Sequence, residues 1–222
     1  MDQQIAVHSA PDPEDRAQAF ALNRDAVSRE TWARLDAFVA LLIERQQRMN
    51  LIGPSTVRHL WTRHVADSLQ LLRLAPDARR WCDLGSGAGF PGLVIACALA
   101  DASGAQVHLV ESIAKKASFL RDCAKALQLP AIVHHQRIED FTRANTVAFD
   151  VVTARALAPL DQLLRLANPL LKTGALGLFP KGQDVEAELT LASKSWKIKA
   201  ELVPSNTDPH GRVVLVRHVA RL

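Results

Sequence analysis

The sequence predicts an α/β fold, a mostly parallel seven-stranded sheet that closes with an antiparallel hairpin and follows an N-terminal helical extension. Three observations support this prediction. From Arg79 onward, short apolar runs alternate with segments of helical periodicity, which is typical of a parallel sheet. A glycine-rich turn at 85–92 joins one apolar run to a helix. Two alternating segments flank the turn 204–211, which indicates a closing hairpin.

The first part of the chain is predicted to be helical. Residues 1–27 are polar and alanine-rich, and we expect them to be frayed or weakly helical and to carry no site chemistry. Ser28 is a suitable N-cap for a helix, whose buried stripe comprises Leu35, Phe38, Leu42 and Met49. The arginines on the other faces of that helix either form a solvated surface or contact phosphate. Ser55 is expected to cap a second helix. We therefore place the extension at 1–78 and the main domain at 79–222.

The second helix carries His64, Asp67 and Ser68 at a spacing that puts them on one face. A Ser/His/Asp set suggests a hydrolase, but the pattern has no strained nucleophile turn and no oxyanion site. We expect a structural hydrogen-bonded trio or one wall of a substrate cleft.

The remaining elements follow the alternation of apolar runs and helical segments. The expected strands are Trp81–Leu84, Val107–Glu111, Ile132–His135, Phe149–Thr153 and Leu176–Phe179, followed by the hairpin strands Ile198–Val203 and Arg212–Val219. The expected helices are Gly92–Ala100, Ala114–Gln128, Leu160–Leu171 and Val185–Trp196.

Composition narrows the protein class. The 222 residues are 48% hydrophobic and 23% charged, which predicts a soluble globular protein with a substantial core. No apolar run approaches the length of a membrane helix, and the N-terminus does not resemble a secretory signal. The three cysteines are widely spaced and fit no metal-ligand pattern, so we expect reduced thiols, no metal and a cytoplasmic location. The net charge of +4 only weakly favours an anionic partner.

The glycine-rich stretch fits two cofactor patterns. Residues 87–92 match G-x-G-x-x-G, the dinucleotide fingerprint, and Glu111 lies at a suitable distance to accept ribose hydroxyls. Residues 83–89, from Asp83 through Gly85, Gly87 and Gly89, equally match D-x-G-x-G-x-G, a pattern associated with S-adenosylmethionine. A plain tight turn is the third alternative. The closing hairpin and the lack of a second catalytic domain after the sheet favour S-adenosylmethionine.

Candidate ligand contacts follow the ends of the predicted strands, where open α/β sheets bind their ligands. Glu111 would hold a ribose, with an exposed strand-end acid as the alternative. Ile138 with Glu139 would bracket an adenine, with an ordinary polar turn as the alternative. Arg155 and Lys181 follow two further strands, and two cations at this edge suit a phosphodiester or a polar base. Surface-exposed cations are the alternative for both.

The absent motifs restrict the reaction. A methyltransferase acting on pyrimidine C5 needs a cysteine nucleophile, and only Cys82 lies near the expected site. An enzyme acting on an exocyclic amine usually carries Asn/Asp-Pro-Pro, whereas this chain has Asn168-Pro169-Leu170-Leu171. The acceptor is therefore expected to have a free lone pair, as guanine N7 does, and its alkylation needs alignment but no general base.

These motifs together resemble the GidB/RsmG family of bacterial 16S ribosomal RNA (guanine-N7) methyltransferases, which have a Rossmann-like class I fold that binds S-adenosylmethionine. The resemblance covers residues 49–182 in family order. It rests on Met49-Asn50-Leu51, His64-x-x-Asp67-Ser68-Leu69, the glycine stretch from Asp83 to Gly92, Glu111-Ser112-x-x-Lys115-Lys116, Arg137 to Phe141, Arg155-Ala156 and Lys181-Gly182.

The resemblance implies cofactor contacts at Gly85, Phe90, Ile138, Glu139 and Arg155, and a target guanine in the decoding region of the small-subunit RNA. Together with the strand-end argument, it predicts an S-adenosylmethionine-dependent rRNA methyltransferase. The cofactor site would comprise Asp83, Gly85, Gly87, Gly89, Phe90, Glu111, Ile138, Glu139 and Arg155. The RNA side would comprise Asn50, His64, Asp67, Arg155 and Lys181.

The catalytic residue is left open, with Arg155 and Lys181 as candidates. The expected partner is 16S rRNA or the small ribosomal subunit, bound by a monomer that does not contact a membrane. One rival is a small NAD-dependent oxidoreductase, although a chain without tyrosine cannot use the usual Tyr-x-x-x-Lys site. The other is an RNA-binding or ribosome-assembly factor built on a methyltransferase scaffold.

Overall fold

The structure is a computed structural model that describes residues 10–24 and 27–222. Helix α1 (Pro13–Asn23) begins at Asp12, whose side chain accepts a hydrogen bond from the backbone N–H of Glu14. The weak helix expected in 1–27 is thus a capped helix over these residues, and the expectation for 1–9 and 25–26 falls outside the described residues. Buried Asp15 stabilises α1 by accepting a hydrogen bond from the backbone N–H of Trp61 at 2.7 Å.

Helix α2 (Arg29–Gln46) confirms Ser28 as its N-cap, because the Ser28 hydroxyl accepts a hydrogen bond from the N–H of Thr31 at 3.1 Å. The expected stripe is buried through Leu42, but the helix ends before Met49. Two arginines of α2 pair with acids of the main domain. Arg34 forms a bidentate pair with Asp101 (2.7 and 2.8 Å), and Arg45 contacts Asp122 at 3.0 Å. These two are therefore docking contacts for α2.

The second expected helix is divided into three pieces: the 3₁₀ turn η1 (Pro54–Thr56), the π-helix η2 (Trp61–Ala66) and helix α3 (Asp67–Leu74). The expected cap at Ser55 is wrong, since Gly53 occupies the N-cap position and no side chain caps the turn. Of the two alternatives for His64, Asp67 and Ser68, the hydrogen-bonded trio is wrong, whereas His64 and Asp67 each line a cavity described below. The Ser68 hydroxyl donates to the backbone carbonyl of His64 at 2.6 Å, while the His64 ring and the Asp67 carboxylate point to other partners.

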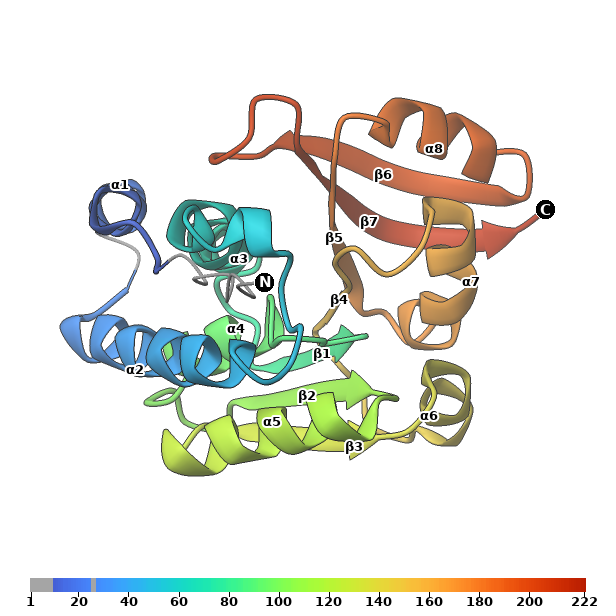
Figure 1. Cartoon of the computed structure of the whole chain (residues 1–222). Coiled ribbons are helices and arrows are strands. Elements are labelled where there is room, and N and C mark those ends of the chain that lie inside the picture. Colours follow the sequence, from blue (N-terminus) through green and yellow to red (C-terminus); the bar gives the residue numbers. More distant parts are fainter. Residues whose placement is uncertain (1–9, 25–26) are drawn as a thin grey trace, which may run out of the picture.

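The seven strands form one sheet in the order β3-β2-β1-β4-β5-β7-β6 (Figure 1). Strands β1 to β5 are mutually parallel, and β7 pairs antiparallel with both β5 and β6, which confirms the predicted sheet and closing hairpin. The strands are β1 (Arg80–Leu84), β2 (Gln106–Glu111), β3 (Ala131–His135), β4 (Val151–Thr153), β5 (Leu176–Lys181), β6 (Trp196–Pro204) and β7 (Arg212–Arg221).

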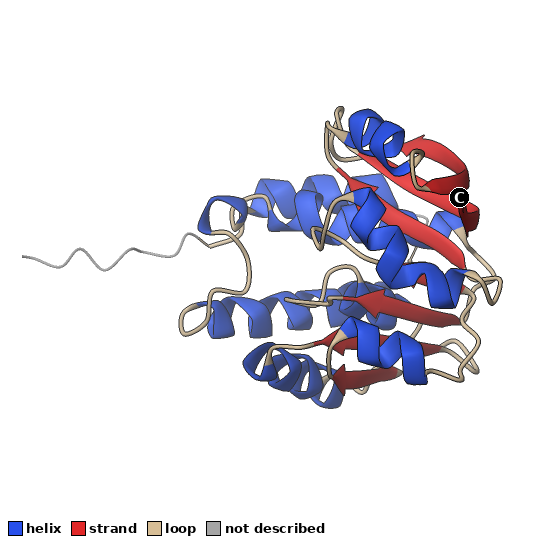
Figure 2. Ribbon diagram, turned by 90° about the vertical axis from the view of Figure 1, so that its right-hand side faces the viewer, coloured by secondary structure: helices blue, strands red, loops and turns tan. Residues whose placement is uncertain are grey.

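Helices cover both faces of the sheet (Figure 2). The strands alternate between two buried cores: Trp81 and Val107 pack with the layer of α2 to α5, whereas Cys82 and Val110 pack with the layer of α6 to α8. The helices of the main domain are α4 (Gly92–Ala98), α5 (Ala114–Ala126), α6 (Ile138–Ala144), α7 (Leu160–Leu171) and α8 (Val185–Ala192).

Besides the divided second helix and shifts of one or two residues at element ends, two further elements differ from the sequence prediction. Helix α6 was expected as a turn; it is helical because Phe141 is buried and packs its ring near Phe149 at 6.3 Å. Helix α8 ends at Ala192 rather than Trp196, which begins β6 and donates its indole N–H to Asp161 at 2.9 Å. In both cases contacts with distant parts of the chain override the local pattern.

Packing does not separate the N-terminal helices from the sheet, because one apolar core contains Leu35 and Phe38 together with Trp81 and Leu109. The division at residues 78 and 79 stays a prediction. No helix in the described ranges is both long and apolar enough to cross a membrane. Over the same ranges, no cluster of three His, Cys, Asp or Glu side chains could hold a metal ion.

Candidate functional site

The glycine loop between β1 and α4 has the backbone geometry that its composition predicts. Gly85, Gly87 and Gly89 have φ values of +72°, +54° and +95°, which lie in the left-handed region that L side chains rarely adopt. A Cβ on Gly85 would also lie 2.7 Å from Cδ1 of Leu157. Glycine is therefore required there both for conformation and for the close approach of the loop after β4.

Asp83 holds this loop in place from within the core. Its side chain is buried; one carboxylate oxygen accepts from the Thr153 hydroxyl at 3.0 Å and the other from the N–H of Gly92 at 3.2 Å. Burial raises the pKa of the Asp83 carboxyl to about 6, and the nearby charge of Glu111 adds to the rise. Asp83 lines neither the cavity beside the glycine loop nor the cavity beside the β6–β7 loop, both described below. Its contacts join β1 to β4 and to the start of α4.

We expect Asp83→Asn to change how stability depends on pH. The pKa of about 6 in the folded state lies above the ordinary 3.8, so this carboxyl stabilises the fold at low pH and loses that contribution as the pH rises from about 4 to about 6. The loss amounts to about 3 kcal/mol as an order of magnitude. Asparagine keeps the acceptor for Gly92 and a polar contact to Thr153 but does not titrate.

Urea unfolding of the wild type and of Asp83→Asn, at about pH 4.5 and about pH 7.5, tests this expectation. Relative to the variant, the wild type should be more stable at the lower pH than at the higher. An equal stability difference at both pH values would show that Asp83 does not titrate in this range.

A cavity of about 640 Å³ opens beside the loop, at the carboxyl ends of the strands. We call it the glycine-loop cavity. Asp83, Gly89, Asn50, Asp67 and Lys181 do not line it. The structure brings together at this cavity most of the residues that the sequence predicted for a cofactor: Gly85, Gly87, Phe90, Glu111, Ile138, Glu139 and Arg155, with His64 from η2.

Glu111 lies at the end of β2 with its carboxylate turned toward the loop. One oxygen accepts from the N–H of Gly87 at 2.9 Å, and the other accepts from the N–H of Ile113 at 2.7 Å. A carboxylate has about four acceptor positions, so each oxygen can still accept from a hydroxyl group. The geometry thus fixes the orientation of Glu111 and leaves it able to hold a diol.

His64 forms part of the cavity wall as a neutral aromatic side chain. Its ring stacks on Phe90 with centroids 4.9 Å apart, and its Nε2 lies 3.2 Å from the Thr56 hydroxyl. Burial lowers the pKa of His64 to about 3, and the charges of Arg155 and Arg63 act in the same direction. At neutral pH His64 is therefore an uncharged packing partner of the loop.

Arg155 lies between two cavities. Besides the glycine-loop cavity, it lines a second cavity of about 880 Å³ between η2, β5 and the loop that joins β6 to β7. We call this the hairpin cavity. Arg155 donates from Nη2 to the carbonyl of Arg63 at 2.8 Å, and its Nε lies 3.7 Å from a carboxylate oxygen of Asp67. Its Nη1 is buried and has no hydrogen-bond partner among the described residues.

The Arg155–Asp67 pair is mostly shielded from solvent, with side chains 17% and 13% exposed, which disfavours both charges. Burial lowers the pKa of Arg155 and raises the pKa of Asp67, and each charge partly offsets the effect on the other. A buried guanidinium with an unpaired N–H group is costly unless a ligand supplies an acceptor. This edge of the structure therefore has the features of a binding site for an anionic or hydrogen-bond-accepting ligand.

A family model described as rRNA small subunit methyltransferase G, or GidB, matches residues 31–212. The chain belongs to the GidB family. Two relatives named ribosomal RNA small subunit methyltransferase G, both from Bradyrhizobium, are highly similar to it. One, from strain BTAi1, is 57% identical over 207 residues, covering 93% of this chain and 92% of that protein. The other, from Bradyrhizobium diazoefficiens, is 59% identical over 187 residues, covering 84% and 72%.

Solved structures confirm the fold class of this GidB member. An O-methyltransferase from Bacillus cereus, crystallised with SAH, superposes with a TM-score of 0.59 at 14% identity and covers 92% of this chain and 99% of that one. The O-methyltransferase TomG from Streptomyces achromogenes, crystallised with SAM, gives 0.59 at 13% identity, with 92% and 97% covered. At such identities the likeness concerns the fold alone.

Two predicted RNA-side residues of the GidB chain are placed less favourably than the others. Lys181 lines the hairpin cavity, but its Nζ donates to Glu188 at 2.6 Å and to the carbonyl of Ala158 at 2.7 Å, which compensates its charge. Asn50 is exposed and lines neither cavity. Their roles stay predictions.

Arg63 was missed by the sequence analysis. It lines both cavities, and its guanidinium makes no ion pair or hydrogen bond within the described part of the chain. No sequence pattern distinguishes it from the other arginines, because its position depends on the π-helical turn of η2.

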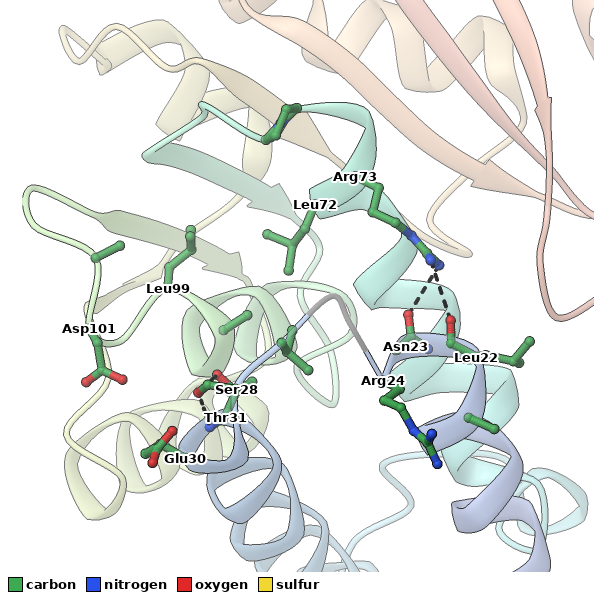
Figure 3. Close-up of a pocket in the computed structure, with 15 residues that line it drawn as sticks. Leu22, Asn23, Arg24, Ser28, Glu30, Thr31, Leu72, Arg73, Leu99 and Asp101 are labelled. Carbon is green, nitrogen blue, oxygen red and sulfur yellow. Dashed lines mark hydrogen bonds between the residues drawn. The ribbon is translucent and has the colours of Figure 1, made fainter.

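A third cavity, of about 800 Å³, lies where α1, α3 and α4 end and α2 begins (Figure 3). Arg73 contributes to its polar wall through hydrogen bonds to Asn23 and to the carbonyl of Leu22. None of the predicted site residues lines this cavity.

Proposed function

We propose that the chain transfers the methyl group of S-adenosylmethionine to N7 of a guanine in the decoding region of 16S ribosomal RNA. The observation that carries the proposal is the position of Arg155, between a cavity built on the glycine loop and a second cavity at the same sheet edge. Membership of the GidB family supports the methyl donor and the ribosomal RNA substrate. The guanine, its N7 atom and the decoding region rest on the family resemblance stated above.

The residues of the glycine-loop cavity fit the donor. Gly85 lets the Leu157 side chain approach the loop closely, and the neutral His64–Phe90 pair provides an apolar wall nearby. In our proposal Glu111 accepts the two ribose hydroxyls, Ile138 and Glu139 hold the adenine at the start of α6, and the loop from Gly85 to Phe90 holds the methionine end. When bound, S-adenosylmethionine supplies an electrophilic methyl group on a positively charged sulfur.

The acceptor base would enter from the hairpin cavity. Guanine N7 has a lone pair and carries no proton, so the protein has to align the base and does not need a general base. Nη1 of Arg155 is a buried donor that can bind an acceptor atom on the base or its phosphate. We assign Arg155 to orienting the acceptor, and Arg63 and Lys181 to the RNA-facing rim. A base in structured RNA has to be turned out of its stack to reach such a site.

The small ribosomal subunit or its RNA is the expected partner, bound in the cytoplasm by a monomer. The net charge of +4 is modest for a nucleic-acid enzyme, which indicates a local basic rim rather than a wholly basic surface. Arg63 and Arg155 provide such a local charge at the two cavities.

Two measurements test the proposal. Calorimetry should detect binding of S-adenosylmethionine and no binding of NAD, and the reverse result would support an oxidoreductase. Mass spectrometry of 16S RNA from a strain lacking the gene should show one missing methylguanosine that the cloned chain restores. Unchanged modification together with altered subunit assembly would instead support a scaffold or assembly role.

A further inference from the structure

The loop that joins β6 to β7 is held against α3 by side chains that lie far from it in the sequence. Asp67 and Gln70, three residues apart on α3, both reach this loop. The loop, residues 205–211, in turn forms one wall of the hairpin cavity. One face of α3 therefore fixes the position of the loop that forms this wall of the hairpin cavity.

Gln70 makes the closest of these contacts. Its side-chain N–H donates to the carbonyl of Pro204 at 2.7 Å, and its side-chain oxygen accepts from the N–H of Asn206 at 2.9 Å. The residue is only 3% exposed, so water cannot replace either hydrogen bond. Both ends of the amide are satisfied by the backbone on each side of Ser205, which fixes the start of the loop.

Asp67 connects the loop to Arg155. One of its carboxylate oxygens accepts from the hydroxyls of Ser205 at 3.3 Å and Thr207 at 3.4 Å. Its other oxygen faces Nε of Arg155 at 3.7 Å. The loop, Asp67 and Arg155 thus form a continuous chain of contacts that ends at the unpaired Nη1.

We propose that Gln70 is a positioning residue for methyl transfer. By fixing the loop, it keeps the hairpin-cavity wall in place and keeps Asp67 and Arg155 oriented toward the acceptor. This inference rests on the proposed function, because it assumes that the hairpin cavity receives the RNA base. It predicts that loss of Gln70 impairs use of the acceptor and leaves donor binding intact.

Gln46 provides a matched control. It is 4% exposed, its side-chain N–H donates to the carbonyl of Ile52 at 2.8 Å, and its side-chain oxygen accepts from the N–H groups of Leu51 and Ile52 at 2.9 and 3.0 Å. Gln46 therefore holds a loop in the same way, but Leu51 and Ile52 line the glycine-loop cavity. Losing it should disturb the donor side instead.

The experiment compares Gln70→Leu and Gln46→Leu in the full chain. For each, S-adenosylmethionine binding is measured by calorimetry, and methyl transfer is measured on small subunits isolated from a strain lacking the gene. We expect Gln70→Leu to lower kcat/KM for the subunit by about tenfold or more and to change the Kd for S-adenosylmethionine by less than about twofold. Gln46→Leu should raise that Kd by about tenfold.

The outcomes separate this inference from the proposed function. If the wild type neither binds S-adenosylmethionine nor methylates subunits, the proposed function fails. If the wild type is active but Gln70→Leu keeps its kcat/KM, or weakens donor binding as much as Gln46→Leu does, the positioning role is overturned. If Gln70→Leu does not fold, the double variant Ser205→Ala, Thr207→Val is used to test the inference. It removes the two hydroxyls that reach Asp67 and leaves Gln70 in place. That variant should show the same selective loss, and full activity would refute the inference.

Discussion

Replacing Arg155 with methionine is expected to lower kcat/KM for methyl transfer by about 100-fold or more. The guanidinium lines both the glycine-loop cavity and the hairpin cavity, and its buried Nη1 has no hydrogen-bond partner among the described residues. Methionine retains much of the side-chain volume but removes the charge and every N–H donor. A hydrogen bond from a charged donor contributes about 1.5–3 kcal/mol, and the upper end of this range corresponds to a loss of about 100-fold.

The fold should survive the replacement of Arg155. Asp67 keeps its two hydroxyl donors, and burial already raises the pKa of its carboxyl, so it can take up a proton when its charged partner is lost. Circular dichroism and thermal unfolding would confirm that the variant is folded before its activity is measured. Arg80→Met is a suitable control, since Arg80 is half-exposed and pairs with Asp150 at 3.6 Å away from both cavities.

Arg155→Lys tests whether charge alone suffices. A lysine has no forked donor group, so it cannot bind the Arg63 carbonyl and an acceptor at the same time in the way that a guanidinium can. We expect Arg155→Lys to recover only a small part of the lost activity. Wild-type kcat/KM for either variant on ribosomal subunits would show that Arg155 does not orient the acceptor.

Gly85→Ala is expected to weaken S-adenosylmethionine binding by about 100-fold. A Cβ at this position would lie 2.7 Å from Cδ1 of Leu157, so either the loop or the Leu157 side chain has to shift, and both line the glycine-loop cavity. The left-handed φ of +72° adds a conformational cost of about 1–2 kcal/mol.

Gly104→Ala separates the two contributions to this effect. Gly104 has nearly the same φ, +74°, but a Cβ there would have no atom within 4 Å. The positive φ should lower the free energy of unfolding by a similar amount in both variants, as measured by urea unfolding. Only Gly85→Ala should lose affinity for S-adenosylmethionine, as measured by calorimetry. Equal affinities for the two variants would show that the contact with Leu157 does not shape the cofactor site.

Much of the fold was predictable because its signals are local. Ser28 caps the helix that follows it, and the glycine loop adopts positive φ, because each depends on residues within a few positions along the chain. The positions of the parallel strands along the chain and the closing hairpin follow from apolar periodicity and turn composition, which are also local. The same locality explains why Glu111 and Arg155 could be placed at strand ends.

Other features depend on contacts between distant residues, so only the tertiary structure reveals them. From the sequence, Lys181 is expected to be an unpaired cation. In the structure, α8 places a carboxylate oxygen of Glu188 2.6 Å from its Nζ. Gln70 has no local signal at all, because its partners Pro204 and Asn206 lie more than 130 positions away in the sequence. Likewise, only the structure shows that Arg155 uses Nη2 and Nε for Arg63 and Asp67 and that its Nη1 has no hydrogen-bond partner among the described residues. Local chemistry determines the elements and the glycine loop, whereas the charge and pairing of each site residue are set by whichever distant groups the fold packs against it.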